Sequence, residues 1–173
     1  SDIIKSKKKY VILRLGSVYG YSDSDTMRIN IMPNLFSKIA SQNGTINLFG
    51  GGKQIKSVVP LIDVVRCMKF MEENEKIKNE TFHLVKETVT VKEVAEICKK
   101  FSPKVKINLT DDQIPNLGYT LSNKKLLKTG FKFLYNIEES ISEMIQKWSF
   151  SKFENDLEHK NRGEKEFIDK RGK

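Results

Sequence analysis

The sequence predicts an α/β fold, and three observations point to that class. An apolar run from Tyr10 to Leu15, bounded by lysines and by Gly16, is typical of a buried strand in a parallel sheet. Amphipathic helical patterns then alternate with short strand patterns along the chain. The 173 residues, 38% of them hydrophobic and 31% charged, suffice for one domain with a real core.

The first predicted strand sets an expectation about the chain as a whole. A parallel strand needs a neighbour, and no segment before Tyr10 can supply one. We therefore expect that the N-terminal part of a larger protein is missing. Further on, the patterns predict helices at 34–42, 63–74, 91–101 and 136–148, and strands at 45–49, 57–59, 79–85 and 105–109.

Local signals fix several of these elements. Pro33 suits the first turn of one helix, and Thr90 with Glu93 forms a capping box at the start of another. In the helix at 63–74, apolar side chains including Val65 and Met68 are expected to pack into the core. The two cysteines, Cys67 and Cys98, lie within apolar helical patterns and are expected to be buried free thiols.

The net charge of +9 is compatible with nucleic acid, a membrane surface or an anionic small molecule as partner. The lysines are spread along the chain, and no nucleic-acid module signature is present, which argues against nucleic acid. No signal peptide or membrane span is seen in the sequence. A cytoplasmic protein that does not bind membranes, nucleic acid or a metal is expected.

The segment from Gly50 to Val64 carries the strongest functional signal. Three glycines permit a tight turn, Lys53 and Lys56 follow, and Pro60 separates a short strand from a helix with Asp63 in its first turn. A turn that carries cations beside a helix start can hold an anion such as a diphosphate. A surface hairpin with solvated lysines is the alternative.

This segment resembles the Gly-x-Gly-x-Gln-x-Arg turn and Val-x-Asp-Val helix start of the extended short-chain dehydrogenase/reductases, the NAD-dependent nucleotide-sugar epimerases and dehydratases. Two more segments resemble that family in the same order. Arg14 to Gly20 is similar to its Arg-x-x-Asn-x-Tyr-Gly segment, and Ser122 to Phe131 is similar to its Asp-x-Ser-Lys segment and the following Gly-Trp. The resemblance covers about residues 10–148.

The resemblance implies the C-terminal part of a Rossmann-type NAD(P)-binding fold, truncated at the N-terminus. That part would hold the last parallel strands and a small α/β substrate-binding subdomain in residues 1–148. Separately, residues 149–173 are interpreted as a charged linker or tail, because 13 of the last 23 residues are charged. The alternative is the start of a following domain, since Phe167 to Gly172 resembles the opening strand of sugar-nucleotide isomerase cupins. The sequence departs from the family where Ser17 replaces Asn, Lys56 replaces Arg, Pro60 replaces His and Ser122 replaces Asp.

The resemblance also implies which residues meet ligands. The intact enzyme would bind a nucleotide-diphosphate sugar and NAD or NADP, and would form a homodimer. Arg28 is interpreted as a solvated arginine. The implied substrate-binding residues are Ser17, Asn34, Gln54, Lys56 and Ser122, and the implied cofactor-proximal residues are Tyr19 and Gly20.

Two motifs that the reductase chemistry needs are absent from the sequence. None of the five tyrosines has a lysine four residues later, and no Gly-x-x-Gly-x-x-Gly follows a strand. Both are expected upstream of Ser1, so this chain alone is expected to be inactive and to bind no NAD. The sequence leaves open the sugar, the base and the choice among epimerase, dehydratase and reductase.

Two other classes of function remain possible from the sequence. One is a non-catalytic binding or regulatory protein of the same fold, such as an NmrA-like sensor. The other is a basic module that binds anions or RNA, for which steep salt dependence of RNA retention would be the signature.

Overall fold

The computed structural model of the chain describes residues 8–22, 24, 27–112 and 116–150. The strands are β1 (Val11–Leu15), β2 (Ser17–Tyr19), β3 (Thr45–Leu48), β4 (Ile55–Pro60), β5 (Glu80–Leu84), β6 (Glu87–Thr90) and β7 (Lys106–Leu109). The helices are α2 (Met32–Ser41), α3 (Leu61–Glu73), α4 (Val91–Phe101), α5 (Lys124–Leu127) and α6 (Ile137–Phe150), with a 3₁₀ turn η1 (Phe49–Gly52).

Strand β1 finds its neighbour downstream. It pairs in parallel with β5, with Val11 opposite Glu80 and Leu15 opposite Leu84. This corrects the expectation that a neighbour had to come from before Tyr10. Among the described residues this sheet has only two strands, so the other edge of β1 is unpaired there.

The other strands form two further small sheets. Strand β4 lies between β2, which is parallel to it, and β6, which is antiparallel, while β3 pairs in parallel with β7. Strands β2 and β6 were not predicted. Their pairing with β4 creates them.

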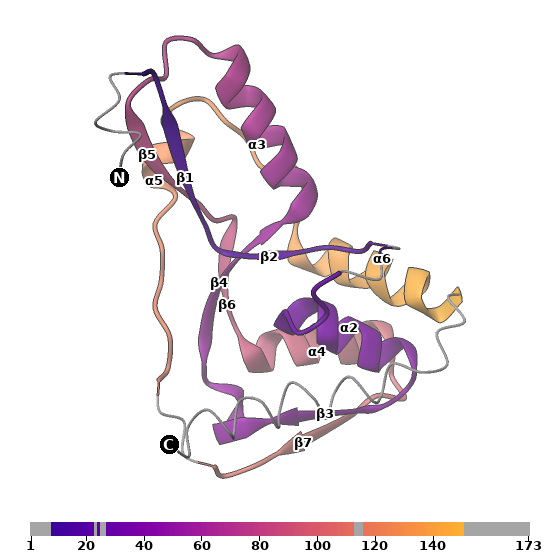
Figure 1. Cartoon of the computed structure of the whole chain (residues 1–173). Helices are drawn as coiled ribbons and strands as arrows, with labels where there is room; N and C mark the ends of the chain where they lie inside the picture. Colours follow the sequence, from indigo (N-terminus) through magenta and orange to yellow (C-terminus); the bar gives the residue numbers. More distant parts are fainter. Residues whose placement is uncertain (1–7, 23, 25–26, 113–115, 151–173) are drawn as a thin grey trace, which may run out of the picture.

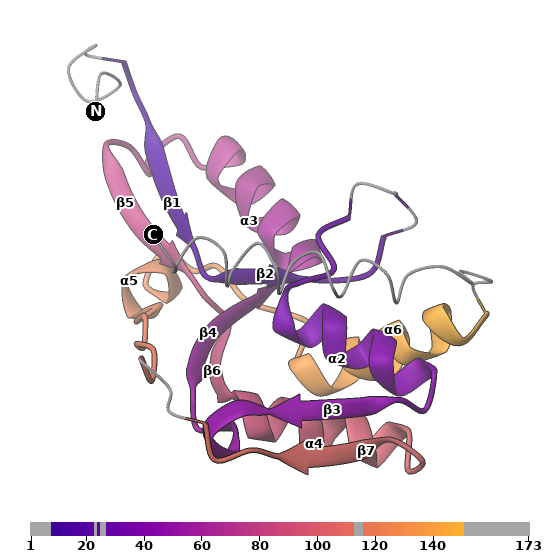
Figure 2. The same cartoon turned by 60° about the horizontal axis from the view of Figure 1, so that its bottom comes forward.

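The molecule has two lobes that share the β2–β4–β6 sheet (Figure 1). We call β1, β5, α3 and α5 the sheet lobe, and β3, β7, α2, α4 and α6 the helical lobe. Successive residues of a strand point to opposite faces. Accordingly Val58 of β4 packs into the core of the helical lobe, and Val59 into the core of the sheet lobe. In Figure 2, α2 and α6 run side by side above the β3–β7 pair.

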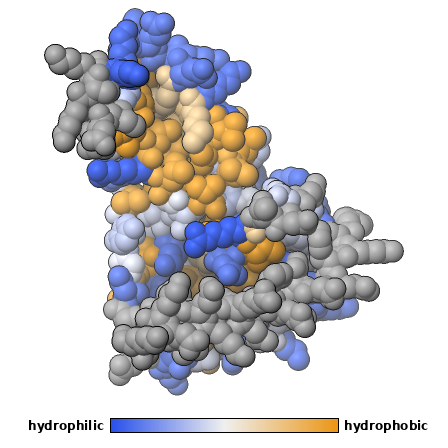
Figure 3. All heavy atoms as spheres, in the orientation of Figure 1, coloured by the Kyte–Doolittle hydropathy of each residue, from blue (hydrophilic) through white to orange (hydrophobic). Residues whose placement is uncertain are grey.

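Helix α3 has two apolar stripes rather than one. Val64, Cys67 and Met71 are buried against the sheet lobe, as predicted. Val65 and Met68 were expected to be packed as well, but they are more than half exposed. They lie about one helical turn apart, each about 100° around the helix from its buried neighbour Val64 or Cys67, so this second stripe faces outward. Figure 3 shows a hydrophobic surface over the part of the molecule where β1 and α3 run.

Asp63 ties the two lobes together at the start of α3. Its carboxylate is fully buried and accepts hydrogen bonds from the backbone N–H groups of Leu134 and Tyr135, at 3.2–3.3 Å. Arg66, one turn later, pairs with the same carboxylate and also donates to the carbonyl of Lys132. The segment that leads into α6 is thereby fastened to the start of α3.

The helix signals of the sequence are confirmed. Thr90 and Glu93 form a complete capping box, and the amide oxygen of Asn136 accepts the N–H of Glu139 at the start of α6. Burial raises the pKa of the Cys67 thiol to about 11 and that of the Cys98 thiol to about 12, so both remain protonated and unreactive at neutral pH.

Two observations concern the limits of the chain. Helix α6 runs from Ile137 to Phe150, two residues beyond the helix end predicted at 148. The predicted linker or cupin-like start otherwise lies outside the described residues. None of the described helices combines the length and the apolar character needed to cross a bilayer.

Candidate functional site

A cleft of about 740 Å³ opens where β1 ends and β2 begins, between β4 and the start of α2. A site at the carboxyl end of a parallel strand is what the fold class predicts. The cleft is lined by Leu15, Gly16, Ser17, Val18, Tyr19, Gly20, Ser22, Met27, Arg28, Ile31, Asn34, Ile55, Lys56, Ser57, Leu61, Gly118, Tyr119 and Leu121.

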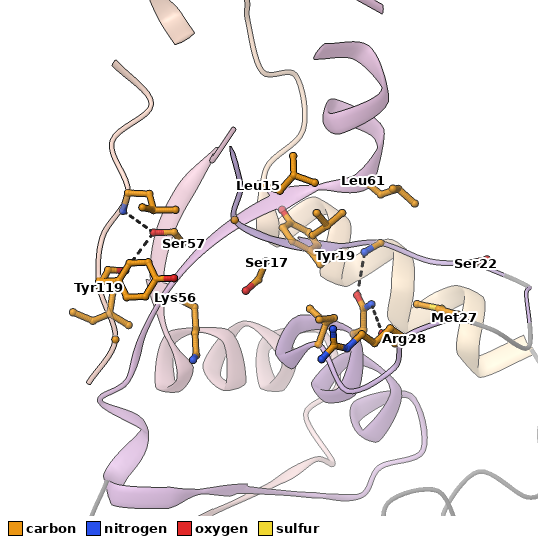
Figure 4. A pocket seen from close by; sticks show the side chains of 18 residues that line it. Leu15, Ser17, Tyr19, Ser22, Met27, Arg28, Lys56, Ser57, Leu61 and Tyr119 are labelled. Atoms are coloured by element: carbon orange, nitrogen blue, oxygen red, sulfur yellow. Dashed lines mark hydrogen bonds between the residues drawn. The ribbon is translucent and has the colours of Figure 1, made fainter. Parts of the chain in front are cut away.

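The charged side chains among the described lining of this cleft are all positive. Arg28 and Lys56 are its charged residues, and no aspartate or glutamate is among the described residues that line it. Neither cation takes part in an ion pair found among the described residues. Figure 4 shows both side chains reaching into the space below Ser17, with the guanidinium of Arg28 directed toward the side of Lys56. The arrangement favours an anionic ligand.

Strand pairing explains why Ser17 and Lys56 share this cleft. Ser17 of β2 lies opposite Val58 of β4, two residues after Lys56. The two side chains therefore come from adjacent parallel strands. A hydroxyl and an ammonium group so placed can both donate hydrogen bonds to a phosphate.

A distant segment, residues 116–121, forms one wall of the cleft. The N–H of Ile55 donates to the carbonyl of Leu117 at 2.6 Å, and the N–H of Leu121 donates to the hydroxyl of Ser57 at 3.0 Å. The contact is close: a Cβ on Gly118 would lie 2.2 Å from the carbonyl oxygen of Ile55. The segment presents Tyr119, which is 71% exposed, at the mouth of the cleft.

Asn34 lies in the first turn of α2 and is buried. Its amide oxygen accepts the N–H of Gly20 at 3.0 Å, and its amide nitrogen donates to the carbonyl of Arg28 at 3.3 Å. Asn34 lines the cleft, but both of its polar side-chain atoms bind backbone groups. Its direct contact with substrate stays a prediction.

Tyr19 also borders the cleft, but its side chain is only 1% exposed and packs in the core of the helical lobe. Burial, together with the nearby carboxylate of Glu87, raises the pKa of the Tyr19 phenol well above its usual value. The hydroxyl therefore stays protonated at neutral pH. Its predicted proximity to a cofactor remains untested, as does that of Gly20.

The glycine turn lies outside the cleft. Gly50, Gly51 and Gly52 have φ angles of 57°, 68° and 71°, a left-handed turn for which glycine is suited. The N–H of Gly51 donates to the carbonyl of Thr110. The turn therefore closes the β3–β7 end of the molecule. Of the charged residues in this motif, Lys56 reaches the cleft, while Lys53 is exposed and does not line it.

Two predicted substrate residues do not line the cleft. The amide nitrogen of Gln54 donates to the carbonyl of Phe49 and braces the glycine turn, and its Oε1 has no partner among the described residues. The hydroxyl of Ser122 accepts the N–H of Lys124 at 3.4 Å beside the start of α5. Their substrate contacts stay predictions, and the structure assigns both a local backbone role.

Sequence reasoning missed two residues of the cleft. Arg28 was interpreted as solvated, and Tyr119 was given no role. Neither carries a local signal beyond residue type, because their neighbours in the cleft come from distant segments. The described residues hold no group of three or more potential metal ligands.

Comparison with known proteins places this geometry in context. The family model described as "NAD dependent epimerase/dehydratase family" matches residues 3–84. The match contains two of the three segments, Arg14 to Gly20 and Gly50 to Val64, and it confirms the resemblance to that family there.

Solved structures of similar fold agree with this match. UDP-glucose 4-epimerase of Thermotoga maritima with UDP-glucose has a TM-score of 0.67 and 20% identity, over 80% of this chain and 45% of that one. The UDP-glucose 4-epimerase of Thermus thermophilus with NAD gives 0.68 and 18%, over 83% and 47%. A dTDP-glucose 4,6-dehydratase from Bacillus anthracis str. Ames with NAD gives 0.64 and 17%, over 80% and 43%.

At sequence identities of 20% or less, these comparisons show similarity of fold only. They confirm the predicted α/β, Rossmann-type class with parallel strands. The chain spans about half the length of the solved structures it matches.

Proposed function

We propose that this chain supplies the nucleotide-sugar-binding half of an NAD-dependent sugar epimerase or dehydratase. The observation that carries the proposal is a cleft with two cations and no carboxylate among its described lining, set at the carboxyl end of a parallel strand. A diphosphate needs positive charge and hydrogen-bond donors, and Lys56 and Ser17 offer both. The UDP-glucose 4-epimerase of Thermotoga maritima was solved with UDP-glucose, and a UDP-glucuronic acid 4-epimerase of Bacillus cereus was solved with UDP-glucuronic acid, which supports the same ligand class here.

We expect that the residues of this chain do not form an NAD site by themselves. The sequence has no glycine-rich pyrophosphate turn and no Tyr-x-x-x-Lys, and the one tyrosine buried beside the cleft, Tyr19, is held protonated. NAD would supply hydride transfer in an intact enzyme. We assign no chemical step to this chain, which we expect to be inactive alone, and its proposed role is to bind and orient the sugar nucleotide.

The binding role is tested with two lysines only three residues apart. Lys56 lines the cleft, whereas Lys53 is exposed and does not. We expect Lys56→Ala to weaken UDP-glucose binding about tenfold or more, because a charge-assisted hydrogen bond is lost. Lys53→Ala removes the same charge and should leave the affinity unchanged. Isothermal titration calorimetry of the full chain measures both, and equal affinities for the two variants would refute the role of Lys56.

A second experiment separates an enzyme from a non-catalytic protein of the same fold. The coding sequence upstream of the Ser1 codon is read in frame. Gly-x-x-Gly-x-x-Gly and Tyr-x-x-x-Lys encoded there would support the enzyme, and activity assays then belong on the longer protein. A stop codon just upstream would instead favour a binding or regulatory role.

A further inference from the structure

We propose that Arg28 is a second anion-binding side chain of the cleft, and that Asn34 is the residue that positions it. This inference rests on the proposed nucleotide-sugar function and deepens it. It differs from the interpretation of the sequence, in which Arg28 is solvated and Asn34 contacts the substrate directly.

Two cations that share one cleft without a carboxylate repel each other. Arg28 and Lys56 are in this position among the described residues, and neither has an ion-pair partner there. A ligand with two negative charges relieves that repulsion in a way that a neutral sugar cannot. A diphosphate has this property.

The two cations also differ in what they can offer. Lysine acts as a point charge, whereas the planar guanidinium of arginine donates two parallel hydrogen bonds to a phosphate. The motif that resembles the epimerase turn has Lys56 where that family has arginine, so the forked donor is missing at that position. Arg28 lines the same cleft and directs its guanidinium into it (Figure 4), so it can supply the missing fork.

Asn34 explains why Arg28 is held at this place. Its side chain is buried in the first turn of α2, so its position is fixed by the helix. One amide joins the N–H of Gly20 and the carbonyl of Arg28, two points of the chain eight residues apart. Its polar atoms are thus engaged with backbone. Asn34 acts on the ligand through Arg28.

The test uses the full chain, with UDP and inorganic pyrophosphate as probes in calorimetric titrations. We expect Arg28→Gln to weaken the binding of both probes about tenfold to a hundredfold. The affinity of Arg28→Lys should lie between that of Arg28→Gln and that of the unmodified chain. The matched control is Arg14→Gln, which removes the same charge from an exposed residue of β1 that does not line the cleft. It should leave both affinities unchanged.

A double-mutant cycle tests the positioning role of Asn34. If Asn34 acts through Arg28, Asn34→Ala weakens UDP binding in the unmodified chain and adds little in the Arg28→Gln background. Full additivity of the two losses would overturn the positioning role and indicate a direct contact. Thermal melting checks that each variant is folded, and the Arg28 variants decide the question of the anion site even if Asn34→Ala does not fold.

The outcomes separate this inference from the proposed function. If Arg28→Gln bound both probes with unchanged affinity while Lys56→Ala bound them more weakly, only the role of Arg28 would be overturned. If Arg28→Gln weakened the binding of UDP but not that of pyrophosphate, Arg28 would contact the nucleoside. That result would overturn its assignment to the phosphate groups. Absence of UDP binding by the unmodified chain would overturn both proposals.

Discussion

The two lobes bury their apolar side chains to different extents. In the helical lobe, α2, α4 and α6 pack on one another and on the β3–β7 pair, and Ile141 and Met144 are almost fully buried. In the sheet lobe, α3 covers β1 and β5 with one stripe while its other stripe, including Val65 and Met68, stays exposed. Parallel sheets are usually covered on both faces. The helical lobe is therefore the closed half of this structure, and the cleft sits at the wall that both lobes share.

The largest effect is expected at the junction between the lobes. Asp63→Ala removes the acceptor of two backbone N–H groups and the partner of Arg66. We expect a loss of about 3–5 kcal/mol in the free energy of unfolding, since three part-buried donors lose the same fully buried acceptor. Urea unfolding measures it. Asp112→Ala, at an exposed carboxylate, is the control, and a similar small change in both variants would contradict the role of Asp63.

A pair of methionines tests the comparison of the lobes directly. Met144 in the helical lobe is 2% exposed, and Met68 on the outer stripe of α3 is 52% exposed. Met144→Ala should cost about 2–5 kcal/mol of unfolding free energy because it leaves a cavity. Met68→Ala should change the free energy of unfolding by no more than about 0.5 kcal/mol. Equal losses in denaturant unfolding would mean that the outer stripe of α3 is covered in solution.

Two glycines with the same backbone conformation sharpen the comparison further. Gly118 and Gly130 both have φ of 91°, but only Gly118 lies against another backbone. Gly130→Ala should cost about 1–2 kcal/mol for the left-handed conformation alone. Gly118→Ala should cost about 1–3 kcal/mol more, because its Cβ would meet the carbonyl of Ile55.

The same glycine pair has a second readout. Gly118→Ala should also weaken UDP binding, since residues 116–121 form a wall of the cleft. Gly130 does not line the cleft, so its variant should bind UDP as the unmodified chain does. Equal melting temperatures and affinities for the two variants would show that the close contact at Ile55 is not present in solution.

The smallest expected effect concerns pH. Burial raises the pKa of Glu87, whose carboxylate accepts the N–H of Ile137 at the start of α6. A carboxyl with a raised pKa in the folded state binds its proton more tightly there than in the unfolded chain. The stabilisation that Glu87 gives to the folded state through this proton is therefore fully present below the ordinary pKa of about 4.3. It is lost as pH rises through the raised pKa.

Glu87→Gln keeps the acceptor and removes the titration. We expect the variant to be more stable than the unmodified chain at pH 7, with the difference vanishing near pH 4. Unfolding free energies measured across this range check the prediction. A difference that does not change with pH would contradict it.

The sequence predicted helices well and long-range partners poorly. The stripes of α2, α4 and α6 and the capping box at Thr90 depend on residues close in sequence, so periodicity and spacing identify them. Strands β2 and β6 exist through pairing with β4, which no local pattern encodes. The outward exposure of Met68 was missed for a related reason, because a helix with two apolar stripes does not reveal which one is covered.

The same limit applies to the candidate site. Lys56 was selected from a local motif and does line the cleft, whereas Gln54 of that motif turns to a nearby backbone carbonyl. The place of Arg28 depends on Asn34 and on a cleft assembled from four separate segments. Residue type alone cannot distinguish such an arginine from a solvated one.

The parallel pairing described above has a consequence for how the chain folds. The partner of β1 begins 69 residues later, at Glu80, and that of β3 begins 61 residues later, at Lys106. High contact order of this kind slows folding, because long loops must close before the contacts form. During synthesis the apolar run of β1 leaves the ribosome well before β5 exists. We therefore expect slow refolding and a tendency to aggregate at high expression rates, both of which slower synthesis at low temperature should reduce.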